Sequence, residues 1–317
     1  MTSKPVICVM GATATGKTEL GLAIADALPV DLISVDSALV YRGMDIGTAK
    51  PDAATRRAYP HALIDCCEPE DTYSAARFVD DARQQVEAAH AAGRLPVLVG
   101  GTHLYYRALL HGLSELPSAD AQLRQRLVER AATLGWAALH AELAEHDAAS
   151  AERIHPNDAQ RIQRALEIIE LSGRPPSEHF AQVVAPARDA DWAVLSMAIA
   201  DDDRAALHAR IERRFDQMMS DGFVEEVERL RLRPALSADH SSMRSVGYRQ
   251  IWRHLDGDCS LADAVEAGKA ATRQLARRQW TWLRKEPGLH WLRLFFSSHA
   301  SLALDRAHHA QTSSTAH

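Results

Sequence analysis

The chain has 317 residues, of which 46% are hydrophobic and 25% charged, and its net charge is −6. This length predicts an α/β core with a further, smaller domain, and the composition is that of an ordinary globular protein. No apolar run approaches the roughly 20 residues of a membrane-spanning helix, and no secretory signal is visible, so we expect a cytoplasmic protein. Four cysteines without paired spacing indicate neither a zinc site nor a disulfide framework.

The first hundred residues alternate short strands with helical patterns. Residues 6–10 are typical of a buried strand, and Leu20, Ile24 and Leu28 follow at helical spacing. Further strands are expected at residues 32–35 and 95–99. This alternation predicts a parallel sheet flanked by helices, with ligands bound just beyond the strand ends.

Beyond Pro117 the pattern changes to helices rich in Ala, Leu, Glu and Arg. The last of them has Asn157 or Asp158 available as N-cap and ends at Gly173. A strand at residues 193–199 then returns the chain to the core, before helices at 210–220 and 261–285. The fold class is therefore α/β, with an inserted all-helical domain and these predicted bounds: 1–117 and 190–296 for the core, 118–189 for the insert, and 297–317 for a disordered tail.

A phosphate-binding loop of the form G-x-x-x-x-G-K-T lies between the first strand and the first helix. Its backbone amides and the helix N-terminus favour phosphate, Lys17 neutralises phosphate oxygens, and the Thr18 hydroxyl is a candidate Mg²⁺ ligand. Nucleotide kinases and NTPases use the same loop, so an ATP-type nucleotide and other diphosphates both stay open at this point. The loop consists of Gly11, Ala12, Thr13, Ala14, Thr15, Gly16, Lys17 and Thr18.

A second polar, glycine-punctuated stretch, residues 36–51, follows the second strand. Asp36 stands at the strand end beside the phosphate loop, where a carboxylate can orient or deprotonate a nucleophile. The alternative, that Asp36 only caps a turn, remains open from the residues themselves.

With these motifs the sequence resembles the tRNA dimethylallyltransferase (isopentenyltransferase) family over nearly its whole length. The matching motifs are residues 11–18, 36–51, 63–65 (LID), 73–74 (YS), 100–106 (GGTHLYY), 155–161 (HPNDAQR), 244–250 (RSVGYRQ) and 271–279 (ATRQLARRQ). The resemblance implies transfer of the prenyl group of dimethylallyl diphosphate to the exocyclic amine of the tRNA adenine next to the anticodon on its 3′ side. Mg²⁺ is the expected cofactor, and a monomer is expected because nothing in the sequence suggests a larger assembly.

The resemblance also implies roles for particular residues. Asp36 accepts a hydrogen bond or proton from the amine, Thr102 neighbours the target base or the diphosphate bridge, and Arg214 binds diphosphate. An adenine stacked in an anticodon loop must be extruded before its amine can react. The residues implied in tRNA binding are Asp36, Ser37, Ala38, Leu39, Thr102, Arg124, Gln160, Arg161, Ile162, Gln163, Arg164, Arg244, Ser245, Val246, Gly247, Tyr248, Arg249, Arg273, Gln274, Arg277 and Arg278.

The distribution of charge agrees with a polyanionic partner. From Arg244 to Lys285 there are nine basic residues against four acidic ones, a net charge of +5 in an acidic protein. Two other interpretations stay open. A small-molecule or nucleotide kinase would give residues 36–51 and the Arg/Gln-rich helix no task. An RNA-binding regulatory ATPase would need a Walker-B carboxylate where residues 100–102 are Gly-Gly-Thr.

Overall fold

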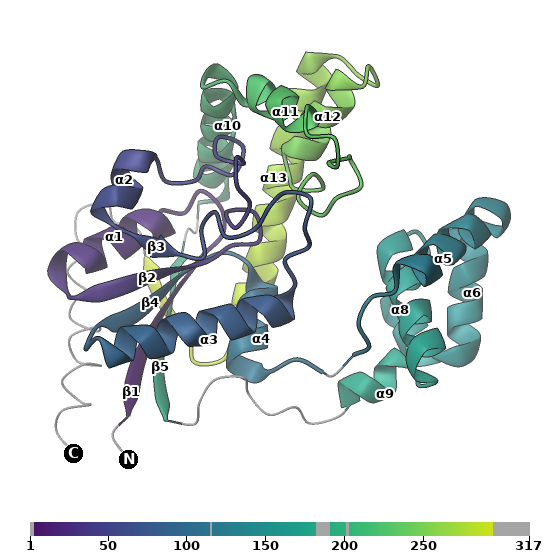
Figure 1. Cartoon of the computed structure of the whole chain (residues 1–317), viewed down its shortest axis with the longest axis horizontal. Helices are drawn as coiled ribbons and strands as arrows, with labels where there is room; N and C mark the ends of the chain where they lie inside the picture. Colours follow the sequence, from purple (N-terminus) through teal and green to yellow (C-terminus); the bar gives the residue numbers. More distant parts are fainter. Residues whose placement is uncertain (1–2, 115, 182–190, 201–202, 294–317) are drawn as a thin grey trace. The chain divides into compact units, whose positions relative to one another are not determined.

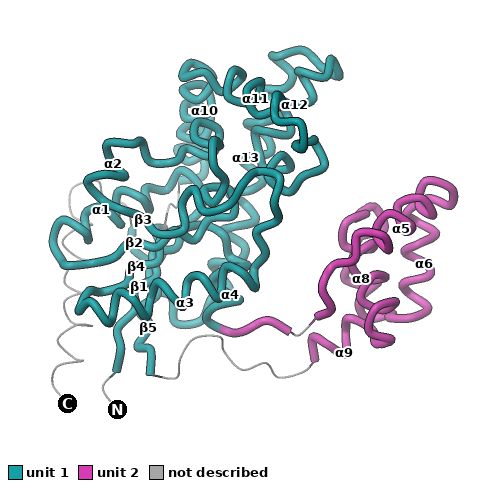
Figure 2. The backbone as a smooth tube through the Cα atoms, in the orientation of Figure 1, with its two compact units in different colours: residues 1–110, 187–317 teal, residues 111–186 magenta. Residues whose placement is uncertain are grey.

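The computed structural model describes residues 3–114, 116–181, 191–200 and 203–293. These fall into two compact units, one made of Met1–Leu110 with Ala187–His317 and the other of His111–Pro186 (Figure 2). The second unit begins a few residues before the insert predicted at 118–189, because helix α4 (His103–His111) ends at its border. The tail predicted at 297–317 lies outside the described residues.

Unit 1 is built on a six-stranded parallel sheet (Figure 1). Its spatial order is β3-β2-β4-β1-β5-β6, so the first strand lies near the middle. This confirms the predicted α/β class with a parallel sheet. The strands are β1 (Lys4–Met10), β2 (Val30–Val35), β3 (His61–Ala62), β4 (Leu95–Gly100), β5 (Trp192–Ala200) and β6 (His290–Arg293).

The register of the central strands brings three loops to one place. Met10 pairs with Gly100 across β1 and β4, and Val35 pairs with the same glycine across β2 and β4. The phosphate loop, the Asp36 loop and the Gly101–Thr102 turn therefore leave the sheet side by side. A Cβ on Gly100 would lie 2.0 Å from the Val35 carbonyl oxygen, so only glycine permits this close approach.

Some helices of unit 1 cover the sheet, and others lie beyond the carboxyl ends of its strands. Leu20 and Ile24 of α1, together with Leu28 at its C-cap, pack against alternate strand residues such as Ile7 and Val9, as their spacing predicted. Figure 1 shows α3 in front of the sheet and α10 to α13 beyond it. The helices are α1 (Lys17–Ala27), α2 (Ala53–Ala58), α3 (Ala75–Ala91), α4 (His103–His111), α10 (Arg204–Ser220), α11 (Phe223–Arg231), α12 (Tyr248–Leu255) and α13 (Leu261–Leu283).

The regular secondary structure of unit 2 is all helical within its described residues, as expected. The Asp158 side chain accepts a hydrogen bond from the Arg161 amide, and Gly173 ends the same helix at φ 68°, which chooses Asp158 over Asn157 as N-cap. Leucines and alanines of the helices form a separate core. The helices are α5 (Ala121–Leu134), α6 (Trp136–His146), α7 (Ala148–Arg153), α8 (Ala159–Ser172) and α9 (Pro176–Ala181).

Some elements differ from the sequence-based prediction. Helix α10 begins at Arg204 and not at residue 210, because the Asp203 side chain caps it by accepting from the Ala206 amide at 2.9 Å. Strands β3 and β6 are too short to show a recognisable pattern in the sequence. They form because each pairs with the edge of a longer neighbouring strand. Within the described ranges, no helix has both the length and the apolar character needed to cross a lipid bilayer.

Candidate active site

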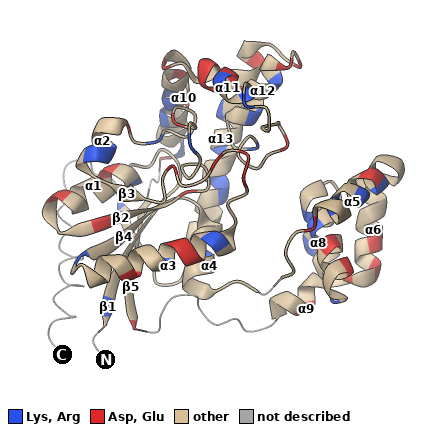
Figure 3. Ribbon diagram, in the orientation of Figure 1, with Lys and Arg blue, Asp and Glu red and all other residues tan. Residues whose placement is uncertain are grey.

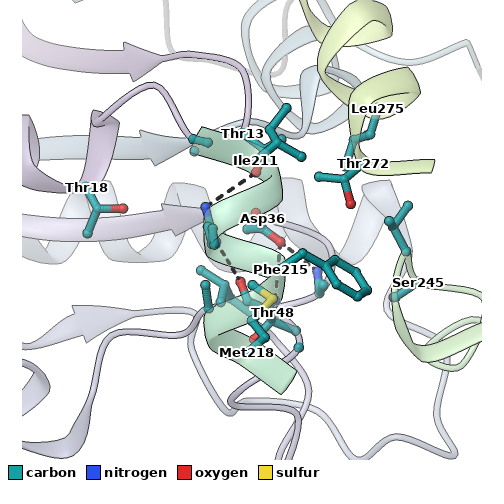
Figure 4. Close-up of a pocket in the computed structure, with 18 of the residues that line it drawn as sticks. Thr13, Thr18, Asp36, Thr48, Ile211, Phe215, Met218, Ser245, Thr272 and Leu275 are labelled. Atoms are coloured by element: carbon teal, nitrogen blue, oxygen red, sulfur yellow. Dashed lines mark hydrogen bonds between the residues drawn. The ribbon is translucent and has the colours of Figure 1, made fainter. Parts of the chain in front are cut away.

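A pocket lies where the three loops leave the sheet, and helices α10 and α13 supply part of its lining (Figure 4). The pocket therefore brings together residues that are far apart in the sequence, from Thr13 to Gln279. Its lining consists of Thr13, Ala14, Lys17, Thr18, Asp36, Ala38, Leu39, Gly47, Thr48, Ala49, Val99, Gly100, Ile211, Arg214, Phe215, Met218, Ser245, Val246, Tyr248, Thr272, Leu275 and Gln279.

The phosphate loop forms the floor of this pocket. Gly16 adopts φ 87° at the start of α1, a conformation that favours glycine. The Thr15 hydroxyl donates to the Ala12 carbonyl at 2.8 Å, and a Cβ on Gly11 would lie 2.7 Å from that hydroxyl. The loop is thus held by its own side chains, with the amino end of α1 directed at the pocket as an anion site requires.

Two cations face the pocket from different elements. Burial lowers the pKa of Lys17 to about 8, with Arg214 acting in the same direction and Asp36 opposing it. Burial also lowers the pKa of Arg214, which donates to the Thr13 hydroxyl and to the Thr48 carbonyl, each at 3.5 Å. The two cations repel each other in a partly buried pocket, and the pKa of each stays lowered although Asp36 acts in the opposite direction, so this arrangement favours a further, multiply charged anion.

The lowered lysine pKa predicts a pH dependence of anion binding. An allylic diphosphate is fully ionised above pH 8, since phosphate groups lose their second proton near pH 6. Its Kd should then rise by up to about tenfold per unit as the pH passes 8, because binding must first restore the proton on Lys17. Equilibrium dialysis from pH 7 to 10 measures this. Lys17→Arg keeps its charge, and an equally steep rise in that variant would contradict the assignment.

The same shift has a defined sign for stability. The folded-state pKa of Lys17 lies below its ordinary value of 10.5, so the unfolded chain binds more protons between pH 8 and 10.5. Lys17 therefore raises the free energy of unfolding as the pH rises from 8 to 10.5. Below pH 8 its charged form lowers the free energy of unfolding.

Asp36 interacts electrostatically with both cations, and the next residue, Ser37, contacts Thr102. The Asp36 Oδ1 accepts from the amides of Ala38 at 2.8 Å and Leu39 at 3.3 Å. Among the described residues no hydrogen bond to Oδ2 is found. Asp36 therefore caps a turn and also presents a free carboxylate oxygen, so the two interpretations of this residue are compatible.

Thr102 and Ser37 contact each other beside Asp36. The Thr102 hydroxyl accepts from the Ser37 amide at 3.0 Å, and the two hydroxyls lie 3.3 Å apart. Thr102 does not line the pocket itself. Its contact to the residue after Asp36 supports the turn that carries the carboxylate.

The structure adds an apolar wall that sequence reasoning did not find. Ile211, Phe215 and Met218 of α10 line the pocket, and Leu275 of α13 lines it as well (Figure 4). Leu39 and Val246 complete it. In the sequence their helical spacing looked like an ordinary core-facing stripe, and the one signal available was their neighbour Arg214. The site thus combines an anion floor with an apolar wall.

A buried carboxylate positions the far rim of the pocket. Glu226 of α11, 2% exposed, accepts from the amides of Asp45 at 2.9 Å, Ile46 at 2.7 Å and Gly47 at 3.1 Å, and from the hydroxyl of Tyr248. The next residue along this loop, Thr48, carries the carbonyl that Arg214 contacts. Glu226 therefore holds the loop that in turn holds a pocket cation.

Glu226→Gln should lower the free energy of unfolding by on the order of 3 kcal/mol, because the buried amide group would present a donor to backbone N–H groups that need an acceptor. Urea denaturation measures the change. Glu225, in the first turn of the same helix, is exposed, so Glu225→Gln should shift stability by less than about 0.5 kcal/mol. Equal, small changes in both variants would show that the loop does not depend on Glu226.

Residues implied in tRNA binding are divided between the two units. In unit 1, Tyr248 is fully buried against Glu226 and belongs to the pocket and core, so its side chain cannot be part of an exposed RNA surface. Four of the nine basic residues from 244 to 285 form ion pairs: Arg244, Arg253, Lys269 and Arg273. For Arg244, Lys269 and Arg273 the acid lies outside this segment. The tertiary structure thus reduces the excess positive charge that the sequence suggested.

Other arginines of α13 retain their free charge. Arg277 lies in a groove between α10 and α13, where Arg204, His208 and Arg284 surround Trp280. Among the described residues, Arg277, Arg204 and Arg284 have no carboxylate partner. Figure 3 shows the basic residues along α13. Sequence reasoning missed Arg204 and His208, which lie far from the basic segment.

In unit 2, the predicted residues lie on or near α8. Arg124 and Arg164 bind the two oxygens of Glu167, at 2.9 Å and 2.6 Å, while Arg161 is 71% exposed. Gln160 is exposed as well, and Gln163 is half-buried. Ile162 is fully buried in the core of this unit, so any contact of this residue with RNA would involve its backbone.

A metal would find few protein ligands here. Within the described ranges no group of three His, Cys, Asp or Glu residues could hold one. Thr18 lines the pocket, with Asp36 on its wall. This donor set fits a Mg²⁺ held mainly by phosphate oxygens and water, which is how that ion commonly binds.

The fold and site define a P-loop α/β protein whose anion site opens onto an apolar wall. Comparison with known proteins identifies it further. The IPP transferase family model matches residues 39–286, and the chain belongs to this family. It is 57% identical to a tRNA dimethylallyltransferase of Thiobacillus denitrificans over 284 residues, 90% of either chain. A relative of the same name from Dichelobacter nodosus is 56% identical over 278 residues, 88% of this chain and 86% of the other.

Solved structures agree with this membership. A tRNA isopentenylpyrophosphate transferase of Bacillus halodurans superimposes with a TM-score of 0.71 at 34% identity, covering 99% of this chain and 98% of the other. A eukaryotic dimethylallyltransferase acting on tRNA gives a TM-score of 0.77 at 26% identity, over 96% of this chain and 78% of its own.

Proposed function

We propose that this protein is a tRNA dimethylallyltransferase. It transfers the dimethylallyl group of dimethylallyl diphosphate to the exocyclic N6 amine of adenine 37, adjacent to the anticodon on its 3′ side, and releases diphosphate. The observation that carries the proposal is the pocket, which places Lys17 and Arg214, an apolar wall and the free oxygen of Asp36 around one space. Relatives with this activity cover most of the chain.

The donor fits the pocket in two parts. Diphosphate would bind on the phosphate loop between Lys17 and Arg214, and the five-carbon chain would lie against Ile211, Phe215 and Leu275. As the bond between allylic carbon and oxygen breaks, negative charge grows on the leaving diphosphate, and the two cations stabilise it. A nucleoside triphosphate would require polar contacts for a sugar and base where this wall is apolar, which disfavours the kinase and ATPase interpretations.

The acceptor side depends on Asp36. An exocyclic adenine amine is a weak nucleophile because its lone pair is delocalised into the ring. Asp36 would accept a hydrogen bond from it and take up the proton as the new carbon–nitrogen bond forms. The flipped adenine would have to enter past Ser37, Ala38 and Leu39, in keeping with base extrusion by RNA-modifying enzymes.

We also propose Mg²⁺ as the cofactor, with the Thr18 hydroxyl as its protein ligand. When bound, the ion supplies charge neutralisation on the diphosphate. Thr18 is well placed for this because it follows Lys17 on the first turn of α1.

A transfer assay tests the function. The protein is incubated with radiolabelled dimethylallyl diphosphate, Mg²⁺ and an unmodified tRNA that carries adenines at positions 36 and 37, and label is counted in the RNA. The expected result is label at A37, lost when A37 is replaced by G. Absence of label, together with phosphoryl transfer from ATP to a metabolite or with ATP hydrolysis, would refute the proposal.

The groove between α10 and α13 should contribute to tRNA affinity. Arg277→Ala should weaken tRNA binding several-fold and reduce the slope of log K against log salt by about 0.7–0.9, as expected for one lost phosphate contact. Filter binding at several salt concentrations measures both quantities. Arg253→Ala, which removes an exposed charge already paired with Asp258, is the control and should change neither. An unaltered slope for Arg277→Ala would remove it from the interface.

A further inference from the structure

Gln279 connects two loops of the pocket that are far apart in the sequence. Its Oε1 accepts from the Thr13 amide at 2.9 Å, and its Nε2 donates to the Gly101 carbonyl at 2.9 Å. Thr13 belongs to the phosphate loop, and Gly101 immediately precedes Thr102. Gln279 itself lies on α13 and lines the pocket.

The contact requires a carboxamide of this length. One atom must accept from an N–H and its neighbour must donate to a carbonyl, and only Asn and Gln side chains carry both groups at one end. Asn is one methylene shorter. Gly101 belongs to the same fit, because a Cβ there would lie 2.5 Å from Gln279 Nε2 and 3.0 Å from the Gly11 carbonyl oxygen.

This contact has a consequence for the phosphate loop. The Thr13 N–H is directed at Gln279, so a diphosphate would rely on the later amides of the loop and on Lys17. The entrance of the loop is therefore oriented by a helix more than 260 residues further along the chain. The Thr13 side chain is oriented separately, through its hydroxyl, by Arg214.

The contact also reaches the acceptor side. From Gly101 the chain passes to Thr102, whose hydroxyl accepts from the Ser37 amide at 3.0 Å, next to Asp36. Thus one side chain ties the loop for the leaving group to the turn that carries the carboxylate. A shift of either loop would strain the other through Gln279.

We propose that Gln279 is a positioning residue that sets the phosphate loop for diphosphate and keeps it in register with the Asp36 turn. This deepens, and rests on, the proposed transferase function. Helix α13, which is also expected to bind tRNA, thereby contributes to the site for dimethylallyl diphosphate.

The test uses Gln279→Met, which keeps the length and removes both hydrogen bonds, and Gln279→Glu, which keeps the acceptor but loses the donor and adds a negative charge. Gln217→Ala is the control, since this exposed glutamine on α10 donates a side-chain hydrogen bond to Asp221 and does not line the pocket. Calorimetry with Mg²⁺ and inorganic diphosphate gives the diphosphate Kd, filter binding gives the tRNA Kd, and the transfer assay gives kcat.

For Gln279→Met we expect the diphosphate Kd to rise about tenfold, as for the loss of two hydrogen bonds, with a lower kcat and a tRNA Kd within about twofold of the parent protein. Gln279→Glu should bind diphosphate more weakly still, because its charge lies beside the loop. If Gln279→Met does not fold, Gln279→Glu carries the test, since it retains the contact to Thr13.

Two results would overturn the proposal: an unchanged diphosphate Kd in the folded variants, or a loss confined to tRNA affinity, which would make Gln279 an RNA contact. Diphosphate binding needs no transfer, so it tests Gln279 even if the parent protein fails to label tRNA. Failure of the proposed function and failure of this inference are therefore distinguishable.

Discussion

Replacing Asp36 by asparagine lowers kcat for prenyl transfer by an expected 10²-fold or more, up to about 10⁴-fold, and leaves the tRNA Kd nearly unchanged. Asparagine keeps the oxygen that accepts from Ala38 and Leu39, so the turn persists. It replaces the free oxygen by an amide nitrogen, which cannot take the proton of the amine. Single-turnover transfer with pre-bound tRNA, alongside a binding titration, separates the two effects.

Asp31 is a suitable control because it lies on β2, the same strand that leads into Asp36, and forms an ion pair with Arg94 at 2.6 Å on the surface. Asp31→Asn should retain the parental kcat. Should Asp36→Asn lose tRNA affinity in the same proportion as turnover, Asp36 would be a binding residue and another group would have to accept the proton.

Lys17→Met should lower kcat/KM by about 10²–10³-fold, the usual effect of removing one charge-stabilising donor from a closed site. Burial lowers the pKa of this lysine to about 8, so at neutral pH it remains mostly charged, and its charge is available to the departing diphosphate. Methionine retains the length and apolar stem of lysine. Initial rates at varied dimethylallyl diphosphate measure the loss.

Lys4→Met provides the comparison for this change. Lys4 begins β1, where its ammonium pairs with Asp191 at 3.1 Å on the surface, and its loss should leave the rate unaltered. A Lys17→Met protein that retained parental kcat/KM would place the diphosphate elsewhere than on this loop.

The positive charge available on the surface was only partly predictable. Arg277 and Arg161 are exposed, but Arg273 pairs with Glu212 at 2.8 Å, and Lys269 pairs with Asp216 at 2.7 Å. Those acids lie on α10, outside the segment whose charge the sequence counted. A local sum of charges overestimates the available positive charge wherever a neighbouring helix supplies carboxylates.

Local sequence alone determined the phosphate loop and the position of Asp36. Gly16, Lys17 and Asp36 act through backbone conformation and short-range order, which nearby residues specify: a strand, a turn and a helix start. The parallel sheet was predictable for the same reason, since alternating strand and helix patterns admit few arrangements.

Only the tertiary structure decided what surrounds that loop. Phe215 and Met218 have the spacing of any buried helix face, and nothing local distinguishes a wall of a pocket from a wall of the core. Glu226 and Gln279 bind backbone groups of loops 179 and 266 residues away, and such contacts exist only once the sheet has brought strand ends and helices together. The anion floor is thus a local property of the sequence, and the enclosed site is a property of the fold.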